Sequence, residues 1–134
     1  MSDSELPDVN FATIERMQLA AKNPNSGPVF MLNLNKYSST AGFPDGALYK
    51  EYMQSISRLV SEVEGKILWR TRVNGQVVGS QEIDEVLGVW CPSNEAFLNI
   101  RNSPSSARNM QLRERVVKSA NLHWCDPYTV MRNP

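Results

Sequence analysis

The sequence predicts an α+β protein in which four strands form an antiparallel sheet and the helices pack on one face of it. Three observations predict this class. Short segments alternate apolar with polar residues, which is typical of strands. Longer segments carry apolar residues three or four positions apart, which is typical of amphipathic helices. The segments follow one another as strand, helix, strand, strand, helix, strand in a chain of 134 residues, the usual size of one domain.

The first two elements are a leading helix and a strand. Asp8 can cap a helix whose apolar positions share one face up to residue 21, and residues 23–28 then break it. The strand covers residues 29–37. Its period of two places Phe30, Leu32 and Leu34 on one face, and Val29, Met31, Asn33, Asn35 and Tyr37 on the other. One face therefore suits a core, and the other is half polar.

The remaining elements follow after a loop. A helix is predicted over residues 47–64, with Gly65 at its C-terminal cap. Asn74-Gly75 is a hairpin signal between a strand that starts at Lys66 and a third strand over residues 85–91, although residues 76–78 could be only an extension. Ser93 can cap another helix, which restarts at Ser103-Pro104 and runs through Ala120; the last strand is NLHWC, residues 121–125.

This order is that of the ferredoxin-like βαββαβ fold. Right-handed crossovers place the first and third strands at the centre of the sheet and both helices on one face. The opposite face, expected to bear Met31, Val86 and Trp90, is too apolar to remain in water, so a second copy of the sheet should cover it and form a homodimer. The face that carries the amides then lines a cavity that faces the partner or a ligand.

Composition excludes several functions. The 14 basic and 14 acidic residues cancel, so nucleic acid is not an expected partner. No apolar run is long enough to span a membrane and no export segment is recognisable, so the expected compartment is the cytoplasm. The only two cysteines, Cys91 and Cys125, are expected to be free and buried. No metal-ligand spacing, nucleophilic triad or nucleotide-binding motif is present, so no metal and no cofactor are expected.

Five segments in order resemble one known family. They are GPVFMLNL, DGALYKEY, GKILW, CPSNEAFL and SPSSARNMQLRERVVKSANL, and the match covers Gly27 to Cys125. They resemble the domain-of-unknown-function family thirteen-thirty, which belongs to the dimeric α+β barrel proteins. The resemblance implies a dimeric α+β barrel domain over residues 27–134, and the leading helix predicted above lies outside the match, in an extension over residues 1–26. Relatives in the superfamily include cofactor-independent monooxygenases, polyketide cyclases, lactone isomerases and stress-response proteins.

The chain departs from the family pattern at four places. Trp90-Cys91 replaces an Arg-aromatic pair, and Leu34-Asn35 replaces Leu-Leu. Ile83 stands where a tryptophan is expected, and Ser106 where tyrosine is frequent. Because these positions lie on or near the expected cavity, they suggest a ligand or reaction different from that of typical members.

A ligand site is predicted around Trp90 on the third strand. Asn33 and Asn35 would flank it from the first strand, and Arg70 and Arg72 from the second. An indole face, orienting amides and an arginine suit a small organic molecule that is planar or carries a carboxylate. Alternatively, the arginines are solvated or paired with glutamates, and Trp90 packs in the dimer interface.

The candidate catalytic residues are His123 and Tyr37. His123 is the only histidine, the residue type most often used for proton transfer near neutral pH, and the fourth strand should bring it near Asn33 or Tyr37. Tyr37 is a possible proton donor. Alternatively, His123 lies at a surface or sheet edge, and Tyr37 is a half-buried packing residue.

These residues predict an enzyme without a cofactor that transfers protons on a small organic molecule, as a cyclase, isomerase or lyase does. His123 would be the acid-base, the amides would stabilise an oxyanion, an arginine would hold an anionic group, and Trp90 would form an apolar wall. A competing hypothesis is a non-catalytic dimer that binds a metabolite or serves in a stress response. A third is a structural protein whose dimer interface is filled by side chains.

Overall fold

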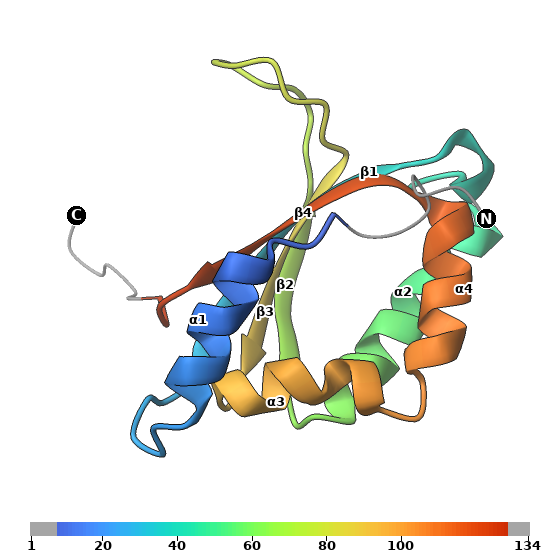
Figure 1. Ribbon diagram of the computed structural model, residues 1–134. Coiled ribbons are helices and arrows are strands. Elements are labelled where there is room, and N and C mark those ends of the chain that lie inside the picture. The colour runs from blue at the N-terminus through green and yellow to red at the C-terminus, as the bar shows by residue number, and fades with distance from the viewer. Residues whose placement is uncertain (1–7, 129–134) are drawn as a thin grey trace.

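The computed structural model describes residues 8–128 and contains a four-stranded sheet with all its longer helices on one face (Figure 1). The strands are β1 (Val29–Tyr37), β2 (Lys66–Arg72), β3 (Glu85–Cys91) and β4 (Val117–Cys125). The α-helices are α1 (Phe11–Ala21), α2 (Ala47–Ser61), α3 (Asn94–Leu98) and α4 (Ser106–Val116), and short 3-10 helices cover Ser39–Ala41 and Asn99–Asn102.

The strand order is β2-β3-β1-β4 and every neighbouring pair is antiparallel. The predicted ferredoxin-like topology is therefore confirmed, with the first and third strands at the centre. Two groups of buried side chains join this sheet to the helices. Tyr37 and Leu87 pack with residues of α2 and α4, while Met31 and Val89 pack with Met17 of α1 and Val60 of α2.

The register corrects the predicted faces of the sheet. Met31 is paired with Val89 and Asn35 with Glu85, so the amide-bearing side of β1 lies against the helices. Phe30, Leu32 and Leu34 share the opposite side with their partners Trp90, Gly88 and Val86. The uncovered side, called here the open face, therefore bears Val86 and Trp90 as predicted, but Met31 does not lie on it. The prediction failed because β1 is apolar on both sides, which leaves its facing ambiguous in the sequence.

Gly65 follows α2 but does not take the left-handed conformation of a helix cap. Glu64 takes it instead, with φ of 63°. Gly65 is needed for a different reason, since a Cβ there would lie 2.8 Å from Val60 Cγ1 and 2.9 Å from the Trp90 carbonyl oxygen. The residue therefore lets the end of α2 approach β3 closely.

The last helix and strand meet earlier than predicted. The helix was expected to run through Ala120, but α4 ends at Val116 and β4 begins at Val117 without a loop. Pairing of Val117 with Tyr37, next to a register shift at Lys36/Tyr37, recruits these residues to the sheet. Sheet pairing at this point outweighs the apolar spacing that favoured helix.

Residues 73–84, called here the arm, connect β2 to β3 and form no strand. The Asn-Gly turn signal therefore lies within a longer projection, which Figure 1 shows rising clear of the helices. The leading helix α1 packs beside α3 and buries Met17. Within the described residues, no helix combines the length and apolarity needed to cross a membrane.

Candidate functional site

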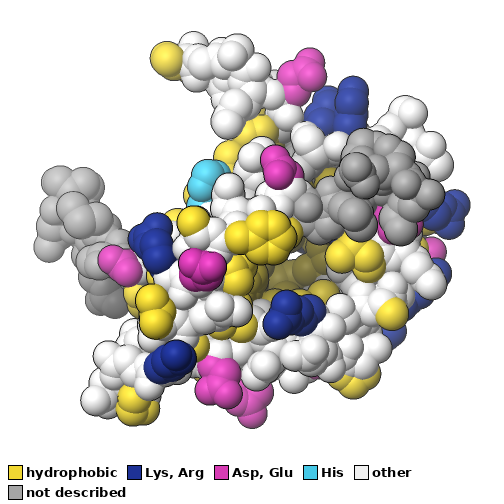
Figure 2. All heavy atoms as spheres, viewed as in Figure 1, with side chains coloured by type: hydrophobic (Ala, Val, Ile, Leu, Met, Phe, Trp, Pro, Cys, Tyr) yellow, Lys and Arg dark blue, Asp and Glu magenta, His cyan; other side chains and the backbone are white. Residues whose placement is uncertain are grey.

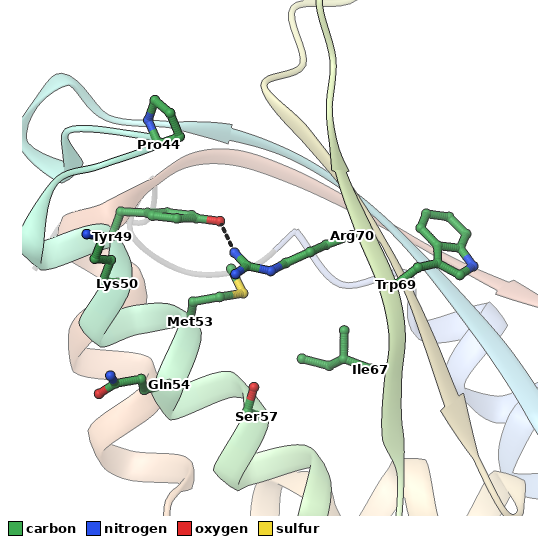
Figure 3. Close-up of a pocket in the computed structure, with 9 residues that line it drawn as sticks. All are labelled: Pro44, Tyr49, Lys50, Met53, Gln54, Ser57, Ile67, Trp69 and Arg70. Atoms are coloured by element: carbon green, nitrogen blue, oxygen red, sulfur yellow. Dashed lines mark hydrogen bonds between the residues drawn. The ribbon is translucent and has the colours of Figure 1, made fainter.

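A cleft of about 730 Å³ lies between α2 and the edge strand β2 (Figure 3). Met53 and Ile67 form apolar walls, and Tyr49 and Arg70 reach toward each other across the opening. Trp69 points to the other side of β2 and forms the outer rim. The complete lining is Pro44, Tyr49, Lys50, Met53, Gln54, Ser57, Ile67, Trp69 and Arg70.

A buried carboxylate lies behind this opening. Glu85 is only 4% exposed. The Tyr49 hydroxyl lies 2.9 Å from Glu85 Oε1 and 2.8 Å from Oε2, and it accepts a 2.6 Å hydrogen bond from Arg70 Nη1. The Tyr37 hydroxyl donates to Glu85 Oε1 at 2.6 Å. Tyr49 therefore connects the solvent side of the cleft to a carboxylate in the protein interior.

Asn35 and Asp84 hold the rear of this cluster. Asn35 Nδ2 donates to the Tyr37 hydroxyl over 3.3 Å, which directs the hydroxyl proton of Tyr37 toward Glu85. Asp84 Oδ2 accepts from the backbone N–H of Tyr37 at 2.9 Å, and Asp84 Oδ1 lies 3.5 Å from Lys36 Nζ. These contacts fix Tyr37 where β1 changes register against β4.

A β-bulge at Leu68 explains why Arg70 reaches the cluster. Ile67 pairs with Val89, but Trp69 pairs with Gly88, so one extra residue stands in β2. A bulge of one residue reverses the side on which all later side chains lie. Trp69 therefore lies on the open face and Arg70 on the helix face. Arg70 Nη1 lies 3.7 Å from Glu85 Oε2, and half of the Arg70 side chain is exposed.

Both tyrosines of the cluster are held in the neutral form. Burial raises the pKa of Tyr49 well above its usual value, and the hydrogen bond to Glu85 raises it further. The same two causes raise the pKa of Tyr37. At neutral pH these groups can donate a proton or pass one on, but they do not serve as stored phenolate bases.

The structure gathers only some of the residues predicted from the sequence. Tyr37, Asn35 and Arg70 belong to the cluster. Trp90 lies on the open face, where Lys66 Nζ is 6.0 Å from its ring centroid, so the predicted arrangement of Trp90 among the amides and arginines is wrong. There are two physical reasons. The bulge in β2 turns Arg70 to the helix face, away from Trp90, and β1 also turns its amides to the helix face.

The other predicted residues lie outside the cluster. His123 is exposed and pairs with Leu32, on the face opposite to Asn33 and Tyr37, so the expected proximity to these two residues is wrong. Asn33 is half-buried on the helix face and donates to the Met31 carbonyl over 3.4 Å. Arg72 is exposed.

Sequence reasoning missed Glu85 and Tyr49. A signal for Glu85 existed, because an acidic residue begins the otherwise apolar strand EVLGVWC and its period places it on the same face as Leu87 and Val89. A carboxylate on a core face requires partners, which are the two tyrosines and Arg70. For Tyr49 no such signal existed, since it lay outside the apolar stripe used to predict α2.

The cleft is suited to an anionic small molecule. Arg70 and Lys50 line it, and Met53 and Ile67 offer apolar contact. Across residues 8–128, no three His, Cys, Asp or Glu side chains are grouped so that they could hold a metal ion.

Fold and site together define an α+β protein of the ferredoxin-like fold with a cleft between α2 and β2 and a buried carboxylate at the rear of that cleft. Solved structures share this fold. A protein of unknown function from Rhodopseudomonas palustris is 22% identical, with a TM-score of 0.73, over 92% of this chain and 97% of that one.

Two further structures carry more descriptive names. A DABB family protein with a ferredoxin-like fold from Mesorhizobium loti is 10% identical, with a TM-score of 0.56, over 77% of this chain and 99% of that one. A dimeric ferredoxin-like protein of unknown function from Thermobifida fusca is 10% identical, with a TM-score of 0.50, over 75% of this chain and 92% of that one. No family model and no curated protein matches the sequence.

Proposed function

We propose that the protein is an enzyme without a cofactor that transfers a proton on a small organic anion bound in the cleft. One observation carries the proposal: the Tyr49 hydroxyl, at the cleft wall, lies between Arg70 Nη1 at 2.6 Å and the Glu85 carboxylate at 2.8 and 2.9 Å. A hydroxyl so placed can receive a proton on one side and release its own on the other.

The proton path follows from these contacts. A C–H bond next to a substrate carbonyl breaks, its proton goes to the Tyr49 oxygen, and the proton of Tyr49 passes to Glu85. The electron pair remains on the substrate as an enolate, whose charge the Arg70 guanidinium stabilises. Return of the proton to another atom of the substrate completes an isomerisation. In an elimination the enolate expels a leaving group, which takes this proton, and in a cyclisation the enolate carbon attacks a second carbonyl of the same molecule, whose oxygen takes it. Tyr49 stays neutral before and after the transfer, in keeping with its raised pKa.

Tyr37 and Asn35 have a positioning role in this mechanism. They lie at the rear of Glu85, and both are buried. The hydrogen bond from Tyr37 holds Glu85 Oε1 in place, so that the carboxylate stays oriented toward the Tyr49 hydroxyl. Roles for His123, Trp90, Asn33 and Arg72 stay predictions and lie outside this mechanism.

The finer assignments are also proposals. The five sequence segments and the fold support membership of family thirteen-thirty, with residues 1–26 as an extension of a barrel domain over 27–134. The apolar open face supports a homodimer that buries Val86 and Trp90, and the Thermobifida fusca protein of this fold is described as dimeric. Cys91 is buried as expected, whereas Cys125 is only half-buried; free thiols at both positions suit the reducing cytoplasm.

A non-catalytic metabolite-binding dimer is the second candidate. The observation that favours it is the exposure of His123, the single histidine, on the face away from the cleft. In this reading the Tyr49–Arg70 pair only binds a carboxylate.

Proton exchange distinguishes the two. The chain is incubated in D₂O with a panel of small keto acids and aromatic ketones, and ¹H NMR follows the loss of the proton next to the carbonyl. We expect exchange above the buffer rate for some members, and a decrease of about 100-fold or more in Tyr49→Phe and Glu85→Gln. Arg58→Met, which removes an exposed charge from α2, is the control and should keep the wild-type rate.

Thermal shift with the same panel completes the test. Stabilisation by a carboxylate that Arg70→Met abolishes, without any exchange, would establish the binder and reject the enzyme. Full exchange activity in Tyr49→Phe would reject the proton path.

A further inference from the structure

The arm has a defined local structure although it forms no strand. Its base is closed by a 2.8 Å hydrogen bond from the Val73 N–H to the Asp84 carbonyl. Nearer the tip, the Gln81 N–H donates to Gln76 Oε1 at 2.6 Å, and Gly79 turns the chain with φ of 108°. These hydrogen bonds between residues of the arm hold it in a defined conformation.

The arm presents two apolar side chains to solvent. Val77 is 100% exposed and Val78 is 88% exposed. Figure 2 shows hydrophobic surface at the tip of the projection, well separated from the body of the molecule. Adjacent valines with no packing inside the chain gain hydrophobic free energy only from another surface.

The chemistry of the tip restricts the partner. Residues 73–81, VNGQVVGSQ, carry no charge, so they offer nothing to a nucleic acid or an anionic membrane. An uncharged apolar tip fits an apolar surface. This chain presents such a surface itself on the open face, where Trp69 is 43% exposed and Val86 and Trp90 are half-buried.

The arm also continues directly from the strands that carry this surface. Val86 is the second residue of β3, immediately after the arm, and the arm rises clear of the helices (Figure 1). A body that rests on the open face therefore lies beside the arm. In a two-fold dimer the same contact occurs twice, because each copy supplies one arm and one face.

We propose that the arm is a clasp, in which Val77 and Val78 of one copy contact a second copy of this chain at the rim of its open face. The proposal rests on the homodimer proposed above and adds to it a contact outside the sheet.

Sedimentation velocity on the full chain tests the clasp. Wild-type protein should be a dimer, and Val77→Asp/Val78→Asp should raise the dimer dissociation constant at least tenfold. Because both side chains point into solvent, the circular dichroism spectrum should stay unchanged. Leu19→Asp, which places the same charge on an exposed position of α1, is the control and should leave the dissociation constant unchanged.

Val86→Asp separates failure of the clasp from failure of the dimer. If Val86→Asp dissociates the dimer and the arm variant does not, the clasp is rejected, and the tip serves another partner or none. If wild-type chain is monomeric at every concentration, both the clasp and the dimer are rejected. Dissociation by both variants, with Leu19→Asp unaffected, supports the clasp.

Discussion

Glu85 is a carboxylate in the protein interior, and its partners determine whether the fold tolerates it. It is bonded to two tyrosyl hydroxyls and lies 3.7 Å from Arg70. Glu85→Gln places an amide donor against a hydroxyl donor and leaves Arg70 without its anion. We expect the free energy of unfolding to fall by about 1–3 kcal/mol, measured by urea denaturation. Glu82→Gln, at an exposed position in the arm, is the control. Equal stabilities of the two variants would contradict the prediction.

The buried thiol of Cys91, also a single residue, should make the free energy of unfolding depend on pH. Burial raises the pKa of its thiol from 9.0 to about 11. The unfolded chain loses the thiol proton near pH 9 while the folded chain retains it, so this contribution to stability is complete below pH 9 and is lost as the pH rises toward 11. Between pH 8 and 10, wild-type protein should lose about 1 kcal/mol more stability than Cys91→Ala. Parallel denaturation series on both proteins measure the difference, and identical slopes would refute it.

At the scale of elements, the sequence predicted what depends on local periodicity. The apolar stripe of α2 and the alternation of side chains in β1 and β3 were enough to predict the type of these elements. Two features depend on pairing instead. The bulge at Leu68 exists only relative to β3, and β4 begins at Val117 because that residue pairs with Tyr37. Neither has a signal within its own segment, and the bulge alone moves Arg70 from one face to the other.

The leading helix offers a test at this scale, since the division at residue 26 stays a prediction. Met17 is 2% exposed and packs with Met31, Val60 and Val89. Met17→Ala should therefore cost about 2–5 kcal/mol, as for other core residues. Leu19→Ala, on the exposed side of α1, is the matched control and should change stability little. A neutral Met17→Ala, measured by chemical denaturation, would mean that α1 contributes little to the core.

At the scale of the whole molecule, the order of elements was enough to predict the topology, but the site was not predictable in the same way. The cluster joins α2, β1, β2 and β3 through Tyr49, Tyr37, Arg70 and Glu85. Each of these contacts spans elements whose relative rotation depends on packing. The sequence alone could therefore suggest that amides and arginines share a site. It could not show that Trp90 and Arg70 lie on opposite faces of the sheet.

The open face leads to the last prediction, which concerns the assembled protein. If two copies shield this face from water, unfolding releases two chains from one particle, and the midpoint must depend on concentration. For a chain of 134 residues, a 100-fold increase in concentration should raise the melting temperature by about 5 °C. Val86→Asp, which places a carboxylate on one of the two central strands of the face, should unfold at one temperature throughout the series. Scanning calorimetry measures both proteins, and a wild-type midpoint that does not vary with concentration would mean that water covers this face.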